Sequence, residues 1–105
     1  MKRIVLACAA GMSTSMVVTR MEKEAAARGL EYQIYAIPEQ NLRDELQSYG
    51  ADVAVVLLGP QVRFKLDENR KLTDGYQIPI AVIDTQAYGT LNGAKVLDQA
   101  LALVN

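Results

Sequence analysis

Apolar residues along this chain follow two alternating patterns: short continuous runs, and longer stretches in which apolar positions recur with helical spacing. The short runs are typical of β-strands and occupy residues 2–7, 31–37, 52–58 and 80–84. Each is followed by an amphipathic stretch, which predicts helices over residues 15–28, 38–49, 60–72 and 91–104. In the first helix, one apolar face is made of Val17, Val18, Met21 and Ala25. The apolar positions of the third are Val62, Phe64 and Leu66.

Strands that alternate with helices indicate a parallel sheet covered by helices on both faces. The run DVAVVLL, residues 52–58, is continuously apolar, which favours a central strand buried on both sides. Right-handed crossover connections then lead to the strand order 2-1-3-4, in one Rossmann- or flavodoxin-like α/β domain over residues 1–105. Such sheets bind ligands beyond the carboxyl ends of their strands, where the strand order reverses. Here that point is the end of the first strand, at Cys8.

Composition narrows the classes of function. The net charge of −1 provides no basic field that would recruit nucleic acid, and no apolar run is long enough to insert into a membrane. A single cysteine among 105 residues cannot form an internal disulfide, which fits a reducing cytoplasm. The chain has no histidine, and so lacks the most common general base and metal ligand.

The segment after Cys8 has the chemistry of a phosphate-binding loop. Small residues let the chain curl so that backbone N–H groups point inward, and the following helix adds its partial positive charge. The expected phosphoryl-binding residues are Ala10, Gly11, Met12, Ser13, Thr14 and Ser15. The same field should lower the pKa of the Cys8 thiol from its usual value of about 8.5 and favour a nucleophilic thiolate.

Comparison with known loop patterns leaves three functions open. The loop is neither a Walker sequence nor a C-x-x-C redox motif, and it comes nearest to the cysteine phosphatase pattern C-x5-R-[ST]. Thr14 stands where that pattern needs arginine, so hydrolysis would lose its bidentate clamp and a thiophosphate should persist. This favours a phosphoryl carrier. The alternatives are a small cysteine phosphatase and a non-catalytic anion-binding domain.

Further candidates follow the other strands on the same rim. Asp84 could act as a general acid, although capping of the next turn is the preferred interpretation. Gln61 could orient the loop. Tyr88 could contact a partner or the phosphoryl group, or it could pack in the core. Met16 is expected in the core. No cluster of carboxylates lies near the loop in the sequence, so no metal site is expected.

Three segments, VLACAAGMSTSMVV, ADVAVVLLGPQV and VIDTQAYGTLNGAKVL, resemble the enzyme IIB component of the phosphoenolpyruvate-dependent sugar phosphotransferase system, in its lactose, cellobiose and chitobiose family. The resemblance implies that Cys8 receives a phosphoryl group from a phosphohistidine on a IIA protein. It further implies transfer to a sugar, such as a β-disaccharide, that a membrane IIC protein imports. The group would be carried covalently without a cofactor, in the cytoplasm at the inner face of the membrane. The implied fold is a four-stranded parallel sheet like that of low-molecular-weight phosphatases.

Overall fold

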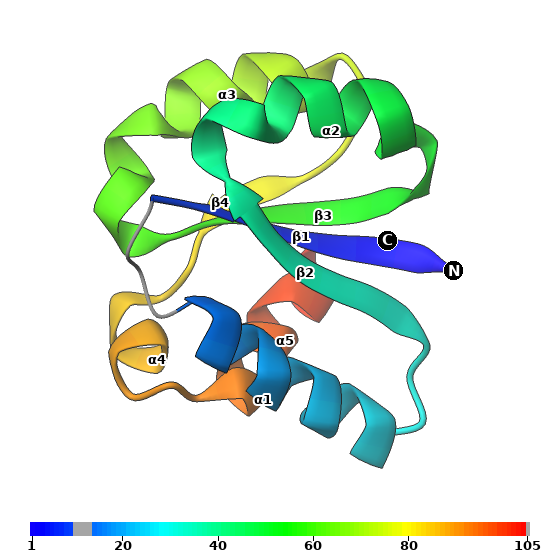
Figure 1. Ribbon diagram of the computed structural model, residues 1–105, viewed down its shortest axis with the longest axis vertical. Coiled ribbons are helices and arrows are strands. Elements are labelled where there is room, and N and C mark those ends of the chain that lie inside the picture. The colour runs from blue at the N-terminus through cyan, green and yellow to red at the C-terminus, as the bar shows by residue number, and fades with distance from the viewer. Residues whose placement is uncertain (10–13, 105) are drawn as a thin grey trace.

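The computed structural model describes residues 1–9 and 14–104, and its centre is a parallel sheet (Figure 1). The strands are β1 (Lys2–Cys8), β2 (Tyr32–Pro38), β3 (Val53–Leu58) and β4 (Ile80–Val82). Every neighbouring pair runs parallel, in the order β2-β1-β3-β4. The predicted strand order is therefore confirmed, with β1 hydrogen-bonded on both sides.

Helices cover both faces of the sheet, as predicted. The α-helices are α1 (Thr14–Ala27), α2 (Leu42–Tyr49), α3 (Leu66–Asp74), α4 (Thr85–Gly89) and α5 (Gly93–Leu103). Short 3₁₀ segments are η1 (Glu39–Asn41), η2 (Gly50–Asp52) and η3 (Pro60–Lys65). Figure 1 shows α2 and α3 on one face and α1, α4 and α5 on the other. Within the described residues, no helix has both the length and the apolar character needed to cross a bilayer.

Two hydrophobic clusters hold these layers together. Because successive side chains of a strand point to opposite faces, Ile4 and Leu6 of β1 enter the cluster under α1 and α5. Val5 and Ala7 enter the cluster on the other face, with Leu42 of α2. The predicted face of the first helix is confirmed, since all four of its residues are buried: Val17, Val18, Met21 and Ala25. Each large apolar side chain buried in this way contributes about 1.5–3 kcal/mol.

The third predicted helix differs from expectation. A 3₁₀ segment occupies residues 60–65, and the α-helix begins only at Leu66, because Val62 has non-helical backbone angles (φ −116°, ψ 22°). Phe64 consequently points outward and is 76% exposed. Met16, expected in the core, is also half exposed, on the outer side of α1.

The region after the fourth strand also differs. β4 ends at Val82, because only Ile80–Val82 pair with β3. Residues 85–89, expected as a turn, form the short helix α4. The last helix begins at Gly93, where Asn92 caps it by accepting a hydrogen bond from the Lys95 N–H at 3.1 Å.

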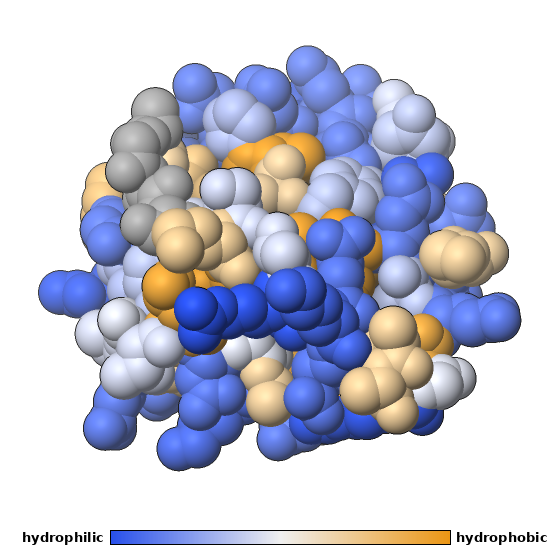
Figure 2. Space-filling view, turned by 60° about the horizontal axis from the view of Figure 1, so that its bottom comes forward, coloured by the Kyte–Doolittle hydropathy of each residue, from blue (hydrophilic) through white to orange (hydrophobic). Residues whose placement is uncertain are grey.

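The outer face of the α1, α4 and α5 layer is mainly polar. Figure 2 brings this part of the molecule forward and shows hydrophilic side chains over most of it, with apolar atoms in small separate patches. Exposed charged residues of α1, such as Arg20 and Lys23, agree with this view. Scattered apolar atoms of this kind are normal on a water-exposed surface.

Gly93 allows α5 to approach α1 closely, which gives a test of the packing. A Cβ atom at Gly93 would lie 2.6 Å from main-chain atoms of Arg20 and Met21. We expect Gly93→Ala to lower the free energy of unfolding by about 1–3 kcal/mol, because the helix backbones would have to separate. Thermal unfolding should show this as a drop of roughly 4–8 °C for each kcal/mol.

Gly89→Ala is the matched control, since a Cβ atom there has no heavy atom within 4 Å. Equal melting temperatures for the two variants would contradict the close approach of α5 to α1.

Candidate functional site

Cys8 ends the central strand at the rim of the sheet. It is 7% exposed and lies opposite Pro38 in the register with β2. Its thiol donates a weak hydrogen bond to the main-chain oxygen of Ile37 at 3.6 Å. On the other side of β1, the Gly59 N–H donates to the oxygen of Ala7 at 2.9 Å. The sulfur therefore sits between the ends of two neighbouring strands, at the predicted switch point.

Thr14 and Tyr88 meet beside this strand end. Thr14 begins α1 and is 3% exposed, while Tyr88 comes from α4 and is 7% exposed. Their hydroxyl oxygens are 3.2 Å apart. The Thr14 side chain also acts to lower the pKa of the Cys8 thiol. Thr14 and Tyr88 are thus directly paired, and Figure 1 shows α4 beside the beginning of α1.

Burial is the stronger influence on the thiol. It raises the pKa of Cys8 above its ordinary value, and the hydrogen bond with Thr14 opposes this increase only in part. The lowered pKa expected from the sequence is therefore wrong. The physical reason is that an apolar environment removes the water that would solvate a thiolate.

Asp84 and Gln99 fix the beginning of α4. The Asp84 carboxylate accepts a hydrogen bond from the Ala87 N–H at 2.8 Å, so the predicted cap is confirmed. The Gln99 side chain accepts from the Asp84 N–H at 2.9 Å and donates to the Val82 oxygen at 2.7 Å. An aspartate before Thr-Gln-Ala-Tyr could have signalled the short helix, whereas no sequence pattern indicates the role of Gln99.

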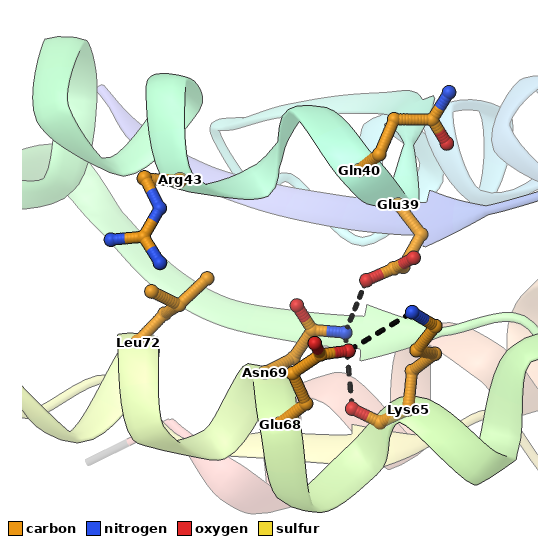
Figure 3. A pocket seen from close by; sticks show the side chains of 7 residues that line it. All are labelled: Glu39, Gln40, Arg43, Lys65, Glu68, Asn69 and Leu72. Atoms are coloured by element: carbon orange, nitrogen blue, oxygen red, sulfur yellow. Dashed lines mark hydrogen bonds and ion pairs between the residues drawn. The ribbon is translucent and has the colours of Figure 1, made fainter.

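A polar pocket of about 230 Å³ lies between α2 and α3 (Figure 3). Its buried Asn69 donates to the Glu39 carboxylate at 2.8 Å and to the Lys65 oxygen at 3.1 Å. Lys65 in turn pairs with Glu68 at 3.1 Å. These polar groups therefore satisfy one another's hydrogen bonds. Asn69 in this way fixes Glu39, which directly follows Pro38, the residue of β2 that pairs with Cys8.

Residues 3–99 match the family model for the lactose/cellobiose-specific IIB subunit of the phosphotransferase system (PTS). The chain belongs to this family. IIB subunits are components of sugar phosphotransferase systems and work with IIA and IIC partners. The family resemblance noted in the sequence is thus confirmed over nearly the whole chain.

Individual relatives cover the chain end to end. It is 41% identical over 104 residues to the oligo-beta-mannoside-specific EIIB component of Bacillus subtilis. That alignment covers 99% of this chain and 97% of the relative. It is 44% identical over 105 residues to the galactose-specific EIIB component of Lactococcus lactis subsp. cremoris, with the same coverage. The solution structure of the cellobiose-specific IIB component from Borrelia burgdorferi superposes with a TM-score of 0.77 at 42% identity, over 99% of this chain and 92% of that one. Three sugars are named at similar identity, so overall likeness does not select one.

The other residues predicted for the site of this IIB subunit do not join the pair of Thr14 and Tyr88. Ala10, Gly11, Met12 and Ser13 lie outside the described residues. Ser15 is exposed in the first turn of α1, where its main-chain oxygen accepts a hydrogen bond from Thr19. Gln61 is exposed near the start of η3, on the rim that follows β3. Among the predicted site residues that the structure describes, Thr14 and Tyr88 are the pair whose side chains meet.

The raised thiol pKa of the IIB subunit predicts a pH dependence. Alkylation of Cys8 by iodoacetamide should be slow near pH 7, and its rate should rise with a midpoint above the ordinary value of about 8.5. Because the folded protein holds the proton more tightly than the unfolded chain, this stability is fully present below the unfolded pKa. It declines as the pH rises from the unfolded toward the folded pKa.

Urea unfolding between about pH 7 and pH 10 checks the sign against Cys8→Ala, which has no thiol to titrate. An alkylation midpoint below that of a free cysteine peptide would contradict the dominance of burial.

The contribution of the Asn69 hydrogen bonds to stability can be tested by truncating the Asn69 side chain. Asn69→Ala leaves the Glu39 carboxylate and the Lys65 oxygen without their buried donor, and we expect a loss of about 1–3 kcal/mol in the free energy of unfolding. Gln40→Ala changes an exposed residue of the same pocket and should have little effect. Chemical denaturation measures both variants, and similar unfolding midpoints would show that the Asn69 bonds contribute nothing.

Proposed function

We propose that this IIB subunit is a phosphocarrier in which Cys8 receives a phosphoryl group from a phosphohistidine of a IIA protein and passes it to a sugar imported by a membrane IIC protein. The observation that supports this most directly is the position of the only cysteine. It ends the central strand at the switch point of the sheet.

The proposed chemistry has two displacements at phosphorus. The thiol first loses its proton, and the thiolate attacks the phosphohistidine phosphorus. The S–P bond forms as the P–N bond breaks, and the imidazole leaves with the electron pair. In the second step a sugar hydroxyl oxygen attacks phosphorus, the S–P bond breaks and the thiolate is regenerated, while the hydroxyl proton goes to solvent or a base. Both steps depend mainly on positioning and charge stabilisation.

In this proposal the segment from Ala10 to Ser15 holds the phosphoryl oxygens. Backbone N–H groups at a helix start suit an anion, and the hydroxyls of Ser13, Thr14 and Ser15 add donors. The phosphoryl group is carried covalently, with no resident cofactor. Because Thr14 stands where cysteine phosphatases have arginine, hydrolysis lacks its clamp and the thiophosphate persists until an acceptor arrives.

The proposed acceptor is a β-linked disaccharide such as cellobiose, chitobiose or lactose. The names of the relatives range over oligo-beta-mannoside, galactose and cellobiose, all within sugar phosphotransferase systems. We place the proposed relay in the cytoplasm, at the inner face of the membrane through contact with IIC. The single domain over residues 1–105 is its phosphocarrier unit.

Intact mass measured with a reconstituted donor chain tests the function. With phosphoenolpyruvate and a matched IIA protein, the native chain should gain the mass of one phosphoryl group and lose it when IIC membranes and cellobiose are added. Cys8→Ser should fold but show no mass gain, because its hydroxyl is a far weaker nucleophile than a thiolate.

A donor chain proven on another IIB protein serves as the positive control. Phosphorylation of Cys8→Ser, or no gain in the native protein with an active matched donor, would contradict the proposal. Steady release of inorganic phosphate without sugar would favour a phosphatase instead.

A further inference from the structure

Phe64 exposes more of its ring to water than any other aromatic side chain among the described residues. It is 76% exposed and belongs to neither hydrophobic cluster. The partly exposed Tyr49 and Tyr76 differ, because each packs one face of its ring. The guanidinium carbon of Arg3 lies 3.9 Å from the centre of the Tyr49 ring, and a Cβ atom at Gly50 would lie 2.6 Å from the Tyr76 ring. Burial of the Phe64 ring would be favourable, so this residue suits a contact that forms only in a complex.

The segment that carries Phe64, η3, is held at both ends. Before it, the Gly59 N–H bonds to the backbone of β1 at 2.9 Å. Within it, Val62 is buried and its non-helical backbone angles leave Phe64 on the outside. At its end, the Asn69 side chain donates to the oxygen of the last residue of η3 at 3.1 Å. A side chain on a fixed segment loses little conformational freedom when a partner covers it.

This segment lies at the edge of the sheet where Cys8 ends β1. Because β1 and β3 run parallel, their carboxyl ends share one edge, and η3 follows β3 there. Figure 1 shows the segment between β3 and α3 at the same end of the sheet as the beginning of α1. A 3₁₀ segment of six residues extends about 12 Å, whereas an interface of about 800 Å² per partner is roughly 30 Å across. A protein that docks over the sulfur therefore also reaches Phe64.

Basic residues stand on both sides of Phe64 in the sequence. They are Arg63 and Lys65, and η3 contains no acidic residue. Lys65 pairs with Glu68 at 3.1 Å, whereas the ion pairs of the described part of the chain do not include the exposed Arg63. An exposed guanidinium next to an exposed ring suits a partner surface that is both apolar and negatively charged.

Of the two partners in the proposed relay, the donor brings negative charge to this surface. A phosphohistidine protein carries about two negative charges on its phosphoryl group when it meets the unphosphorylated IIB subunit. In the second step the phosphoryl group is already on Cys8, and the sugar hydroxyl that approaches it is neutral. Charge complementarity therefore favours the phosphorylated donor as the occupant.

We propose that Phe64 and Arg63 form a docking contact for the phosphorylated IIA protein. The Phe64 ring enters an apolar part of the donor surface, and the Arg63 guanidinium faces its phosphorylated site. The proposal rests on the proposed function, because it takes IIA to be the source of the phosphoryl group for Cys8. Neither side chain is a reacting group. Loss of either should therefore weaken docking and leave transfer within the complex intact.

Phe64→Ala tests the apolar half of the contact. The variant should keep the native melting temperature, because the ring is exposed. The KM for phosphorylated IIA should rise about five- to thirtyfold, while the rate of phosphorylation at saturating IIA stays at the native value. Phe64→Tyr keeps the ring and should restore the native KM.

Arg63→Gln tests the charged half. The KM for phosphorylated IIA should rise about two- to fivefold at low ionic strength, and the difference from the native chain should shrink at about 0.5 M salt. Arg70→Gln is the matched control. It removes the same charge from an exposed residue of α3, which pairs with Asp67 at 3.4 Å, and should leave the KM unchanged.

Binding can also be measured without transfer, in chains that carry Cys8→Ser. Calorimetric titration with phosphorylated IIA should show the same five- to thirtyfold weakening on addition of Phe64→Ala. Adding Arg63→Gln should weaken binding of phosphorylated IIA more than binding of unphosphorylated IIA, because only the former carries the phosphoryl charge. With Cys8 intact, fully phosphorylated Phe64→Ala should pass its phosphoryl group to cellobiose through IIC membranes at the native rate.

The inference is overturned if Phe64→Ala has the native KM and the native affinity for phosphorylated IIA. Slower discharge to IIC with an unchanged KM for IIA would also overturn it, since the surface would then serve the acceptor. A native chain that accepts no phosphoryl group would instead overturn the proposed function. The titrations with Cys8→Ser, which need no transfer, distinguish that result from loss of the docking contact.

Discussion

Burial of β1 on both faces and both edges is the constraint on which the rest of the structure depends. Its side chains alternate between two hydrophobic clusters, and its backbone is hydrogen-bonded to β2 and β3. A strand enclosed in this way can present chemistry only at its ends. Cys8 occupies the carboxyl end, and the helices that follow β1 and β2 in the chain, α1 and α2, lie on opposite faces of the sheet. The location of the sulfur is therefore a consequence of the sheet order.

Two hydrogen-bonded pairs of polar groups, one on each face of the sheet, fix the segments around the carboxyl end of β1. On one face Thr14 pairs with Tyr88, and on the other Asn69 binds the residue that follows β2. Each pair joins segments that are far apart in the sequence, and each lies where an unpaired polar group would be strongly destabilising. Such pairs define one arrangement of the rim more sharply than apolar packing alone, because their hydrogen bonds are directional.

The opposing influences on the pKa of the Cys8 thiol fit a phosphoryl carrier that reacts only when a partner protein is docked. Burial keeps the thiol protonated in the isolated subunit, and the Thr14 hydroxyl offsets part of this effect. A thiol in this state reacts slowly with small electrophiles in water. In the proposed relay, a docked donor brings the phosphoryl group directly to the sulfur, and positioning replaces general reactivity. This fits membership in a family of phosphotransferase components.

The sequence by itself determined the strand–helix alternation, the strand order and the place of Cys8, because periodicity and crossover handedness are properties of short segments and of L-amino-acid chains. It also indicated Asp84 as a cap. Only the tertiary structure decided that the thiol pKa is raised, because burial depends on what packs around a residue. It likewise decided the break at Val62 and the pairing of Thr14 with Tyr88, which lie 74 positions apart. No local pattern encodes contacts of that range.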